Sequence, residues 1–205
     1  RLAFLINDLE LIKNLFNSEN IVRKELNYNG RVEFLNHHLC HLASTYYSSG
    51  FDDALVVSYD GVGEIDTMAI GIGESGEIFV KENNNKYPNS LGLLYAAVTH
   101  YLGWKYCYDE GIVMGLASLG DPNAIIPGKD ISYLKVFEET LKIKDDFTFE
   151  LNIPDYMNFF DERDVWIGKK FIEFFGNKRE KNDSITKHHM NIAAGLQRRI
   201  EDVVI

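Results

Sequence analysis

The residues from His37 to Asp60 have types and spacings that could bind a metal ion. His37 and His41 are four positions apart, so in a helix their imidazoles lie on one face and can reach one ion. Asp60 follows at the end of an apolar segment and adds a carboxylate oxygen. Two imidazoles and a carboxylate suit iron, manganese, zinc or a similar ion, with coordination positions left for a substrate. The simpler alternative is an incidental or structural histidine pair.

The neighbours of these histidines have more modest predicted roles. His38 points elsewhere on a helix than His37, so it is expected to support the metal ligands or to face a substrate. Cys40 lies three positions from His37 and could ligate, but a small buried thiol is the favoured interpretation.

Asp60 is followed directly by a glycine-containing turn, Asp60-Gly61-Val62-Gly63. Glycine lets a backbone approach an anionic group closely, and turn amides can cradle a phosphate. Asp-Gly is also a frequent hairpin turn, so a purely structural role is the alternative. The two interpretations are compatible, because a hairpin turn can face a nucleotide cleft.

The elements that must position these residues are a helix and a sheet. A helix is predicted over 38–48, since Ser48, Ser49 and Gly50 form a stop signal. Three short apolar runs separated by tight turns predict an antiparallel meander, with strands over 53–60, 67–72 and 76–81.

The rest of the chain is predicted to be mostly helical. Ser90 is expected to cap a helix over 91–102 that ends at Gly103. Periodicity predicts further helices over 1–18, 110–119, 131–141, 165–175 and 189–205, a strand over 31–35 and a hairpin over 146–153. We interpret residues 123–160 as an insertion.

Composition limits the function classes. The chain has 205 residues, 45% of them hydrophobic and 25% charged, which is ordinary for a globular protein. A formal charge of −10 argues against broad nucleic-acid binding. Cys40 and Cys107 are too few for a disulfide framework, and no apolar run would span a bilayer, so a cytoplasmic protein is expected. The start at Arg1, in mid-helical pattern, suggests a piece of a longer protein.

Two later segments, residues 90–95 and 110–120, are rich in small residues. On spacing alone, close packing of a helix against a neighbour is the favoured interpretation. His188 and His189 lie in a polar stretch and are interpreted as a solvated pair.

Four motifs in this order and spacing closely resemble the N-terminal catalytic domain of the O-carbamoyltransferases that modify nodulation factors, cephem antibiotics and aminoglycosides. The motifs are His-His-Leu-Cys-His-Leu-Ala-Ser (37–44), Val-Ser-Tyr-Asp-Gly-Val-Gly-Glu (57–64), Asn-Ser-Leu-Gly-Leu-Leu-Tyr (89–95) and Val-Met-Gly-Leu-Ala-Ser-Leu-Gly (113–120). The resemblance is strong over residues 31–122 and moderate over 189–205.

The resemblance implies an α/β fold of the actin-like ATPase and sugar-kinase (ribonuclease H-like) type, with two lobes. Residues 1–50 would then finish the first lobe and residues 51–205 would begin the second. The metal ligands would be His37, His41 and Asp60, with a further Asp expected beyond Ile205.

The family also implies a nucleotide site. Gly61 and Gly63 would neighbour the phosphates, while Glu110 and Gly115, with Met114, would lie near the nucleoside. The family often has a Lys at the position of Ile112, so a charge contact there is in doubt.

The implied chemistry has two steps. Carbamoyl phosphate and ATP would give carbamoyl adenylate on a separate, C-terminal adenylate-forming domain. The metal-bearing domain would then pass the carbamoyl group to a hydroxyl of a small-molecule acceptor. A divalent transition metal is expected, iron before manganese or zinc, although two histidines and an aspartate do not by themselves select one ion.

The resemblance leaves the general base unassigned and the alternatives open. No nucleic-acid or membrane partner is expected, and the piece alone is expected not to turn over. The rival interpretations are a domain like those that transfer threonylcarbamoyl groups to tRNA, and a non-catalytic nucleotide- or metal-binding module.

Overall fold

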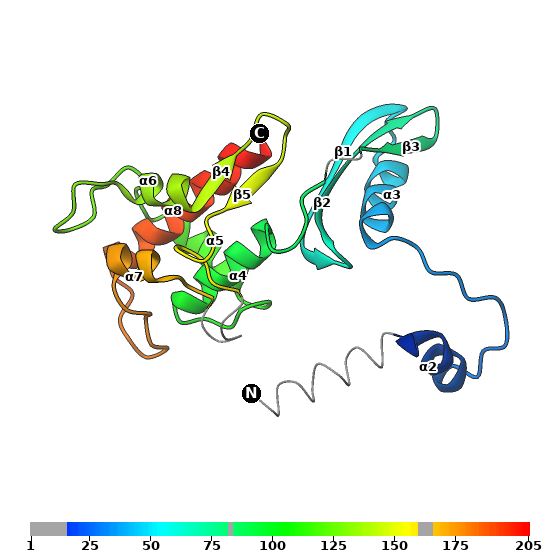
Figure 1. Cartoon of the computed structure of the whole chain (residues 1–205), viewed down its shortest axis with the longest axis horizontal. Coiled ribbons are helices and arrows are strands. Elements are labelled where there is room, and N and C mark those ends of the chain that lie inside the picture. Colours follow the sequence, from blue (N-terminus) through cyan, green and yellow to red (C-terminus); the bar gives the residue numbers. More distant parts are fainter. Residues whose placement is uncertain (1–15, 82–83, 160–165) are drawn as a thin grey trace. The chain divides into compact units, whose positions relative to one another are not determined.

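A computed structural model describes residues 16–81, 84–159 and 166–205 (Figure 1). The chain divides into two compact units, Arg1–Leu35 and Asn36–Ile205, and each is described by itself.

The first unit contains α2 (Ser18–Glu25), a helix with no buried residue. The sequence analysis did not predict this helix, whose eight residues include only two apolar side chains, Ile21 and Val22, neither of them buried. Local polar contacts hold it instead: Arg23 pairs with Glu19 at 2.7 Å and donates to the Gly30 carbonyl at 2.8 Å. The latter bond joins the helix to the residues that follow it.

Two other predictions concern this unit. The helix predicted over 1–18 lies almost entirely outside the described residues. The strand predicted over 31–35 is wrong, since these residues form no regular structure. Apolar alternation alone does not make a strand, because a strand also needs a hydrogen-bonded neighbour.

The second unit begins with a helix and a sheet. The antiparallel meander predicted from the sequence is confirmed, with the order β1-β2-β3 (Figure 1). Its strands are β1 (Asp53–Gly63), β2 (Asp66–Glu74) and β3 (Glu77–Val80). The turn between β2 and β3 uses positive φ angles at Ser75 and Gly76, where glycine is favoured.

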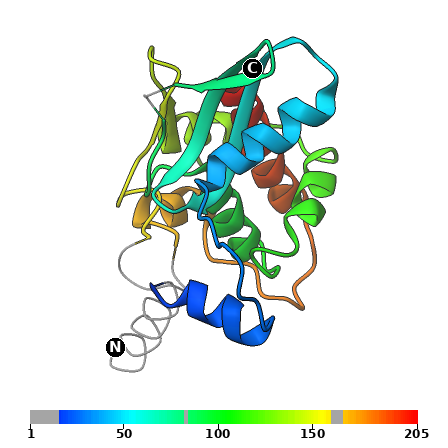
Figure 2. The same ribbon diagram turned by 90° about the vertical axis from the view of Figure 1, so that its right-hand side faces the viewer.

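Helix α3 (His37–Ser49) lies across one face of this sheet (Figure 2). Its buried Leu42 and Tyr46 pack with Val56 and Ala69 in a small core. Gly73 makes the close approach feasible, since a Cβ there would lie 2.3 Å from the Tyr46 ring. The predicted helix over 38–48 is thus confirmed, one residue longer at each end.

The remaining elements build the larger core. They are α4 (Leu91–Tyr101), α5 (Glu110–Ala117), α6 (Tyr133–Thr140), α7 (Lys169–Phe175), α8 (Lys187–Val204) and a hairpin of β4 (Leu141–Ile143) and β5 (Phe149–Leu151). The predicted helices over 91–102, 110–119, 131–141 and 189–205 match α4, α5, α6 and α8 closely. The hairpin starts earlier than predicted, because its first strand follows α6 directly.

Residues 123–160 contribute large side chains to this core. Tyr133, Phe137, Phe149 and Tyr156 are all almost fully buried. Rings from α7 join them, with Phe137 and Phe175 stacked at 5.6 Å. This region therefore packs against the helices that follow β3.

The described residues form a mixed α/β arrangement, with one antiparallel sheet and packed helices. None of the helices in the described part of the chain has the length and apolar character needed to cross a bilayer.

Candidate metal centre

The first turn of α3 presents the two predicted histidine ligands. Asn36 caps the helix, since its Oδ1 accepts a hydrogen bond from the Leu39 amide at 2.9 Å. Helix periodicity then places His37 and His41 one turn apart on the same face, as expected. Gly50, with φ of 75°, ends the helix in the left-handed conformation.

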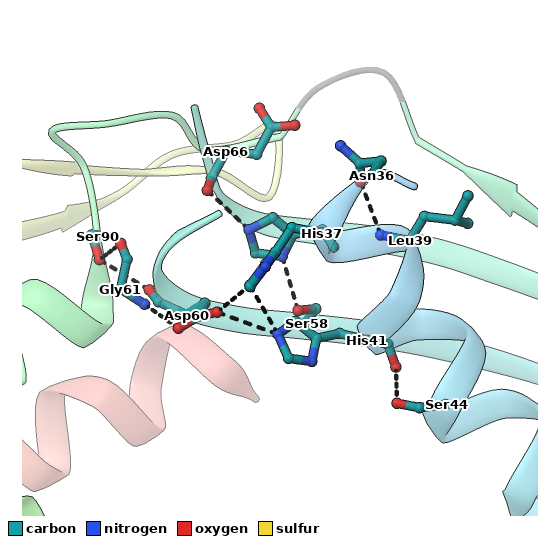
Figure 3. A network of polar contacts seen from close by, with 11 residues as sticks. Asn36, His37, Leu39, His41, Ser44, Ser58, Asp60, Gly61, Asp66 and Ser90 are labelled. Carbon is teal, nitrogen blue, oxygen red and sulfur yellow. Dashed lines mark hydrogen bonds and ion pairs between the residues drawn. The ribbon is translucent and has the colours of Figure 1, made fainter. Parts of the chain in front are cut away.

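Asp60 comes from the last part of β1, where the pairing with β2 is irregular. The register shifts between Tyr59 and Gly63, as in a β-bulge. The Asp60 carboxylate is fixed from its own side, because Oδ1 accepts the Gly61 amide at 2.6 Å. Its other oxygen, Oδ2, faces the two histidines (Figure 3).

The three ligand atoms form a small triangle. Asp60 Oδ2 lies 2.6 Å from His37 Nε2 and 3.3 Å from His41 Nε2, and the two nitrogens are 3.0 Å apart. Ligands bound about 2.1 Å from one ion and at right angles lie about 3 Å from each other. The donor set therefore fits one face of a metal coordination sphere.

Hydrogen bonds alone explain this triangle poorly. If both histidines donated from Nε2 to Asp60, two N–H groups would face each other across 3.0 Å. Among the described residues, these three side chains also form a cluster of possible metal ligands. Their ligand atoms all lie within 4.8 Å of one another. If the two imidazoles and the carboxylate bound one ion, each nitrogen and the carboxylate oxygen would donate a lone pair to it, and no N–H groups would face each other.

The Asp60 carboxylate is ready to act as an anionic ligand. Partial burial acts to raise its pKa, but hydrogen bonds from His37, the Gly61 amide and His41 outweigh burial and hold the pKa below its ordinary value. The ligand side chains remain 37–50% exposed, so a substrate can approach from solvent.

Of the two roles predicted for His38, support of the ligands or contact with a substrate, its burial favours the first. It is 1% exposed, and its Nδ1 and Nε2 lie 2.9 Å from Ser58 Oγ and from the Asp66 carbonyl (Figure 3). Both ring nitrogens are thus engaged by β1 and β2. His38 anchors the start of α3 on the sheet and so holds the neighbouring His37 in place.

The two glycines of the Asp-Gly-Val-Gly turn have different surroundings. A Cβ at Gly63 would lie 2.2 Å from the His37 ring, whereas a Cβ at Gly61 would meet no atom within 4 Å. Gly63 therefore gives the His37 imidazole room to lie against the turn. The Gly61 amide serves the Asp60 carboxylate, and Gly61 also borders a cavity beside the metal site.

That cavity has a volume of about 430 Å³ and lies among β1, α4, α5 and α8. Asp60 and Gly61 belong to its lining, and Glu110 and Met114 line it as well. Gly115, the other predicted nucleoside neighbour, is not part of the lining. The volume is in the range typical of small-molecule sites.

Polar groups in the cavity are arranged by the helices around it. Glu110 Oε1 accepts the Cys107 amide at 2.5 Å, which ties the loop before α5 to its first turn. Tyr95 Oη donates to Gln197 at 3.0 Å. Burial, reinforced by the negative charges of Glu110 and Glu201, raises the Tyr95 pKa, so its hydroxyl stays protonated.

Sequence reasoning identified Ser90 as a helix cap but missed its contact with the metal site. Ser90 Oγ lies 3.0 Å from the Asp60 carbonyl and 2.6 Å from the Gly61 carbonyl, and it also accepts the Leu93 amide at 3.0 Å (Figure 3). Gly92 permits this approach, since a Cβ there would lie 2.7 Å from the Gly61 nitrogen. The small residues of segment 90–95 were the available signal.

The small residues of segment 110–120 are used differently. A Cβ at Gly120 would lie 2.1 Å from the Met190 carbonyl, which fits the predicted close packing. Gly115 has no atom within 4 Å of such a Cβ, so packing does not explain it. Ile112, in the same segment, is 47% exposed.

His188 differs from the predicted solvated pair, because it bonds Tyr133 Oη at 2.6 Å and the Phe175 carbonyl at 2.9 Å.

Comparison with known proteins adds a family to this geometry. Residues 7–205 match the family described as carbamoyltransferase N-terminus. The chain is 36% identical over 173 residues to protein sll1178 of Synechocystis, covering 84% of this chain and 26% of that protein.

Two rhizobial proteins are also similar. Nodulation protein NolNO of Sinorhizobium fredii is 30% identical over 176 residues, covering 85% of this chain and 22% of that protein. Nodulation protein NolO of Bradyrhizobium diazoefficiens is 29% identical over 170 residues, with 83% and 27% covered. The chain thus spans about a quarter of the length of the relatives it matches.

Proposed function

The chain belongs to the carbamoyltransferase N-terminus family, and on that basis we propose that it is the metal-binding part of an enzyme that transfers a carbamoyl group to a small molecule. The carbamoyl group would come from carbamoyl adenylate, made from carbamoyl phosphate and ATP, and would pass to an acceptor hydroxyl. Family membership supports carbamoyl transfer in general. The observation that carries the finer proposal is the His37, His41 and Asp60 triangle, whose Asp60 also lines a cavity of about 430 Å³.

Each part of this arrangement has a proposed task. A divalent transition metal, when bound, would supply Lewis acidity that polarises a carbonyl or phosphoryl oxygen. His37, His41 and Asp60 would hold it. His38 would fix the start of α3 on the sheet, and Ser90 would fix the end of β1. Iron is the preferred ion in this proposal, ahead of manganese or zinc.

The cavity beside the triangle would bind the adenylate. Its apolar lining includes Tyr59, Tyr95 and Met114, which suit the faces of a nucleobase and ribose. Glu110 adds a carboxylate that could accept from nucleoside hydroxyls. An adenosine held here would direct its phosphate toward Asp60 and Gly61. An adenylate-forming domain elsewhere in the parent protein would be the partner, and we assign no general base.

The test starts with the metal. The wild-type 205-residue chain, loaded with Fe²⁺, Mn²⁺ or Zn²⁺ and desalted, should retain one ion per chain by plasma mass spectrometry. The variant His37→Ala/His41→Ala should retain almost none, with circular dichroism confirming its fold. The control is His189→Ala, which removes a histidine of α8 outside the triangle; because the His189 ring accepts the Thr186 amide at 3.0 Å in the cap of α8, circular dichroism checks the fold of this variant as well.

Equal metal content in the wild type and the double variant would remove the ligand assignment. The transfer reaction is tested on the full-length parent protein, by measuring pyrophosphate release from ATP that depends on carbamoyl phosphate. Metal binding without such release, and without carbamoylation of any hydroxyl acceptor, would favour the non-catalytic module instead.

A further inference from the structure

A second cavity lies beyond the C-terminal end of α4, whereas the metal centre contacts its N-terminal cap. It has a volume of about 360 Å³ and lies between the loop after α4 and residues 178–181. The cationic side chains that line it are Lys105, Lys178, Arg179 and Lys181, against the carboxylates Asp109 and Glu180. Such a positive excess is unexpected in a chain with a formal charge of −10.

Arg179 is the buried part of this cavity. It is 5% exposed, and its guanidinium lies 4.6 Å from the centre of the Trp104 ring. Its Nε donates to the Leu102 carbonyl and its Nη1 to the Asp183 carbonyl, each at 2.6 Å. Nη2 has no hydrogen-bond acceptor among the described residues. These three contacts hold the guanidinium in place and leave both N–H groups of Nη2 available in a preorganised group.

The backbone is shaped to hold Arg179 there. Gly103 has φ of 86°, and a Cβ at this position would lie 2.6 Å from the Arg179 carbonyl and 3.2 Å from Nη2. A side chain would be strained in this conformation and would also crowd the free guanidinium nitrogen. The glycine thus preserves space next to the available donor.

The lysines keep their charge available as well. Lys178 Nζ lies 2.9 Å from His100 Nε2, a contact with a ring nitrogen and not with a carboxylate. Lys181 has no ion pair with its side chain in the described part of the chain. Asp109 Oδ2 accepts the Lys105 backbone amide at 2.9 Å, so part of its capacity as an acceptor is used locally. The carboxylates present do not neutralise the lysines.

We propose that this cavity binds a small molecule through its phosphate groups, with Arg179 Nη2, Lys178 and Lys181 as the anchoring cations. A guanidinium and several ammonium groups around one space match the charge and oxygen count of phosphate better than those of a single carboxylate. The volume accommodates a phosphorylated metabolite or a nucleotide. This site is separate from the metal centre and does not depend on the function proposed there.

The test uses the 205-residue chain in EDTA, so that no metal at His37 and His41 can bind the probe. Inorganic pyrophosphate, inorganic phosphate and ATP are titrated by calorimetry at low ionic strength. We expect pyrophosphate or ATP to bind with one site per chain, and Lys178→Ala/Lys181→Ala to weaken that binding at least about tenfold. Tighter binding of ATP than of pyrophosphate would identify a nucleotide, and the reverse an inorganic or small phosphorylated ligand.

The control is Lys142→Ala/Lys169→Ala, which removes the same charge from exposed lysines outside the cavity. This control variant should bind the probes as the wild type does. Both double variants should have the thermal stability of the wild type, because Arg179 is untouched. The proposal is overturned if no probe binds, or if the two double variants lose affinity equally, since the effect would then be one of net charge.

Discussion

At the scale of single residues, the geometry of the candidate metal site depends on Gly63 as well as on the candidate ligands. A Cβ at Gly63 would overlap the His37 ring, at 2.2 Å. Gly63→Ala should therefore displace the imidazole from the triangle and lower metal affinity by about 10- to 100-fold, the range typical of residues that orient a ligand. Competition with a chromophoric chelator measures the affinity of wild type and variant.

Gly61→Ala is the matched control, two residues away in the same turn. A Cβ at Gly61 meets nothing within 4 Å, so this variant should bind metal within about threefold of the wild type. Equal effects of the two substitutions would show that flexibility of the turn, and not the space beside His37, is the cause.

The convergence of the three candidate ligands could be expected from the sequence, and the contacts around them could not. His37 and His41 are linked by helix periodicity, and Asp60 follows from the end of an apolar strand, so short-range patterns bring out all three. The contact of Gly63 with the His37 ring joins two separate elements. Such contacts depend on how a helix packs on a sheet, and a single sequence does not encode that in any local pattern.

At the scale of elements, the N-terminus of α4 holds the strand end that carries Asp60. Ser90 both caps α4 and contacts the carbonyls of Asp60 and Gly61. Ser90→Ala should lower the free energy of unfolding by about 1–2 kcal/mol, as the loss of a cap does, and should also weaken metal binding because Asp60 loses its anchor. Urea unfolding and chelator competition report the two effects separately.

Ser132→Ala separates capping from positioning. Ser132 caps α6 in the same way, since its Oγ accepts the Lys135 amide at 3.2 Å, but it makes no contact with the metal site. The substitution Ser132→Ala should lower the free energy of unfolding by about 1 kcal/mol and leave metal affinity unchanged. If Ser132→Ala weakened metal binding as much as Ser90→Ala does, general loss of stability would explain both.

Element boundaries show where sequence patterns sufficed. The meander and the capped helix α4 carry strong turn and cap signals, and both appear where predicted. Helix α2 has only two apolar residues and buries neither, and residues 31–35 alternate like a strand without a partner. Local pattern identifies an element only when packing or pairing supports the same conformation.

At the scale of the whole molecule, the unit Asn36–Ile205 brings together the three candidate ligands from two elements that are separate in the sequence. His37 and His41 come from α3, which packs on the sheet in the small core, while Asp60 comes from the end of β1, where Ser90 at the start of α4 contacts it. An ion bound by all three would connect these parts. Unfolding separates them, so the metal should bind the folded state much more tightly than the unfolded one.

Metal should consequently stabilise this unit by mass action. At a free concentration about 100 times the dissociation constant, a ligand specific for the native state adds about 2.7 kcal/mol, which for a chain of this size raises the melting temperature by roughly 5–10 °C. Calorimetry with added Zn²⁺ or Mn²⁺ measures the shift, and excess EDTA should reverse it. His37→Ala/His41→Ala should melt at one temperature with or without metal, whereas a shift that survives in this variant would place the stabilising ion elsewhere in the chain.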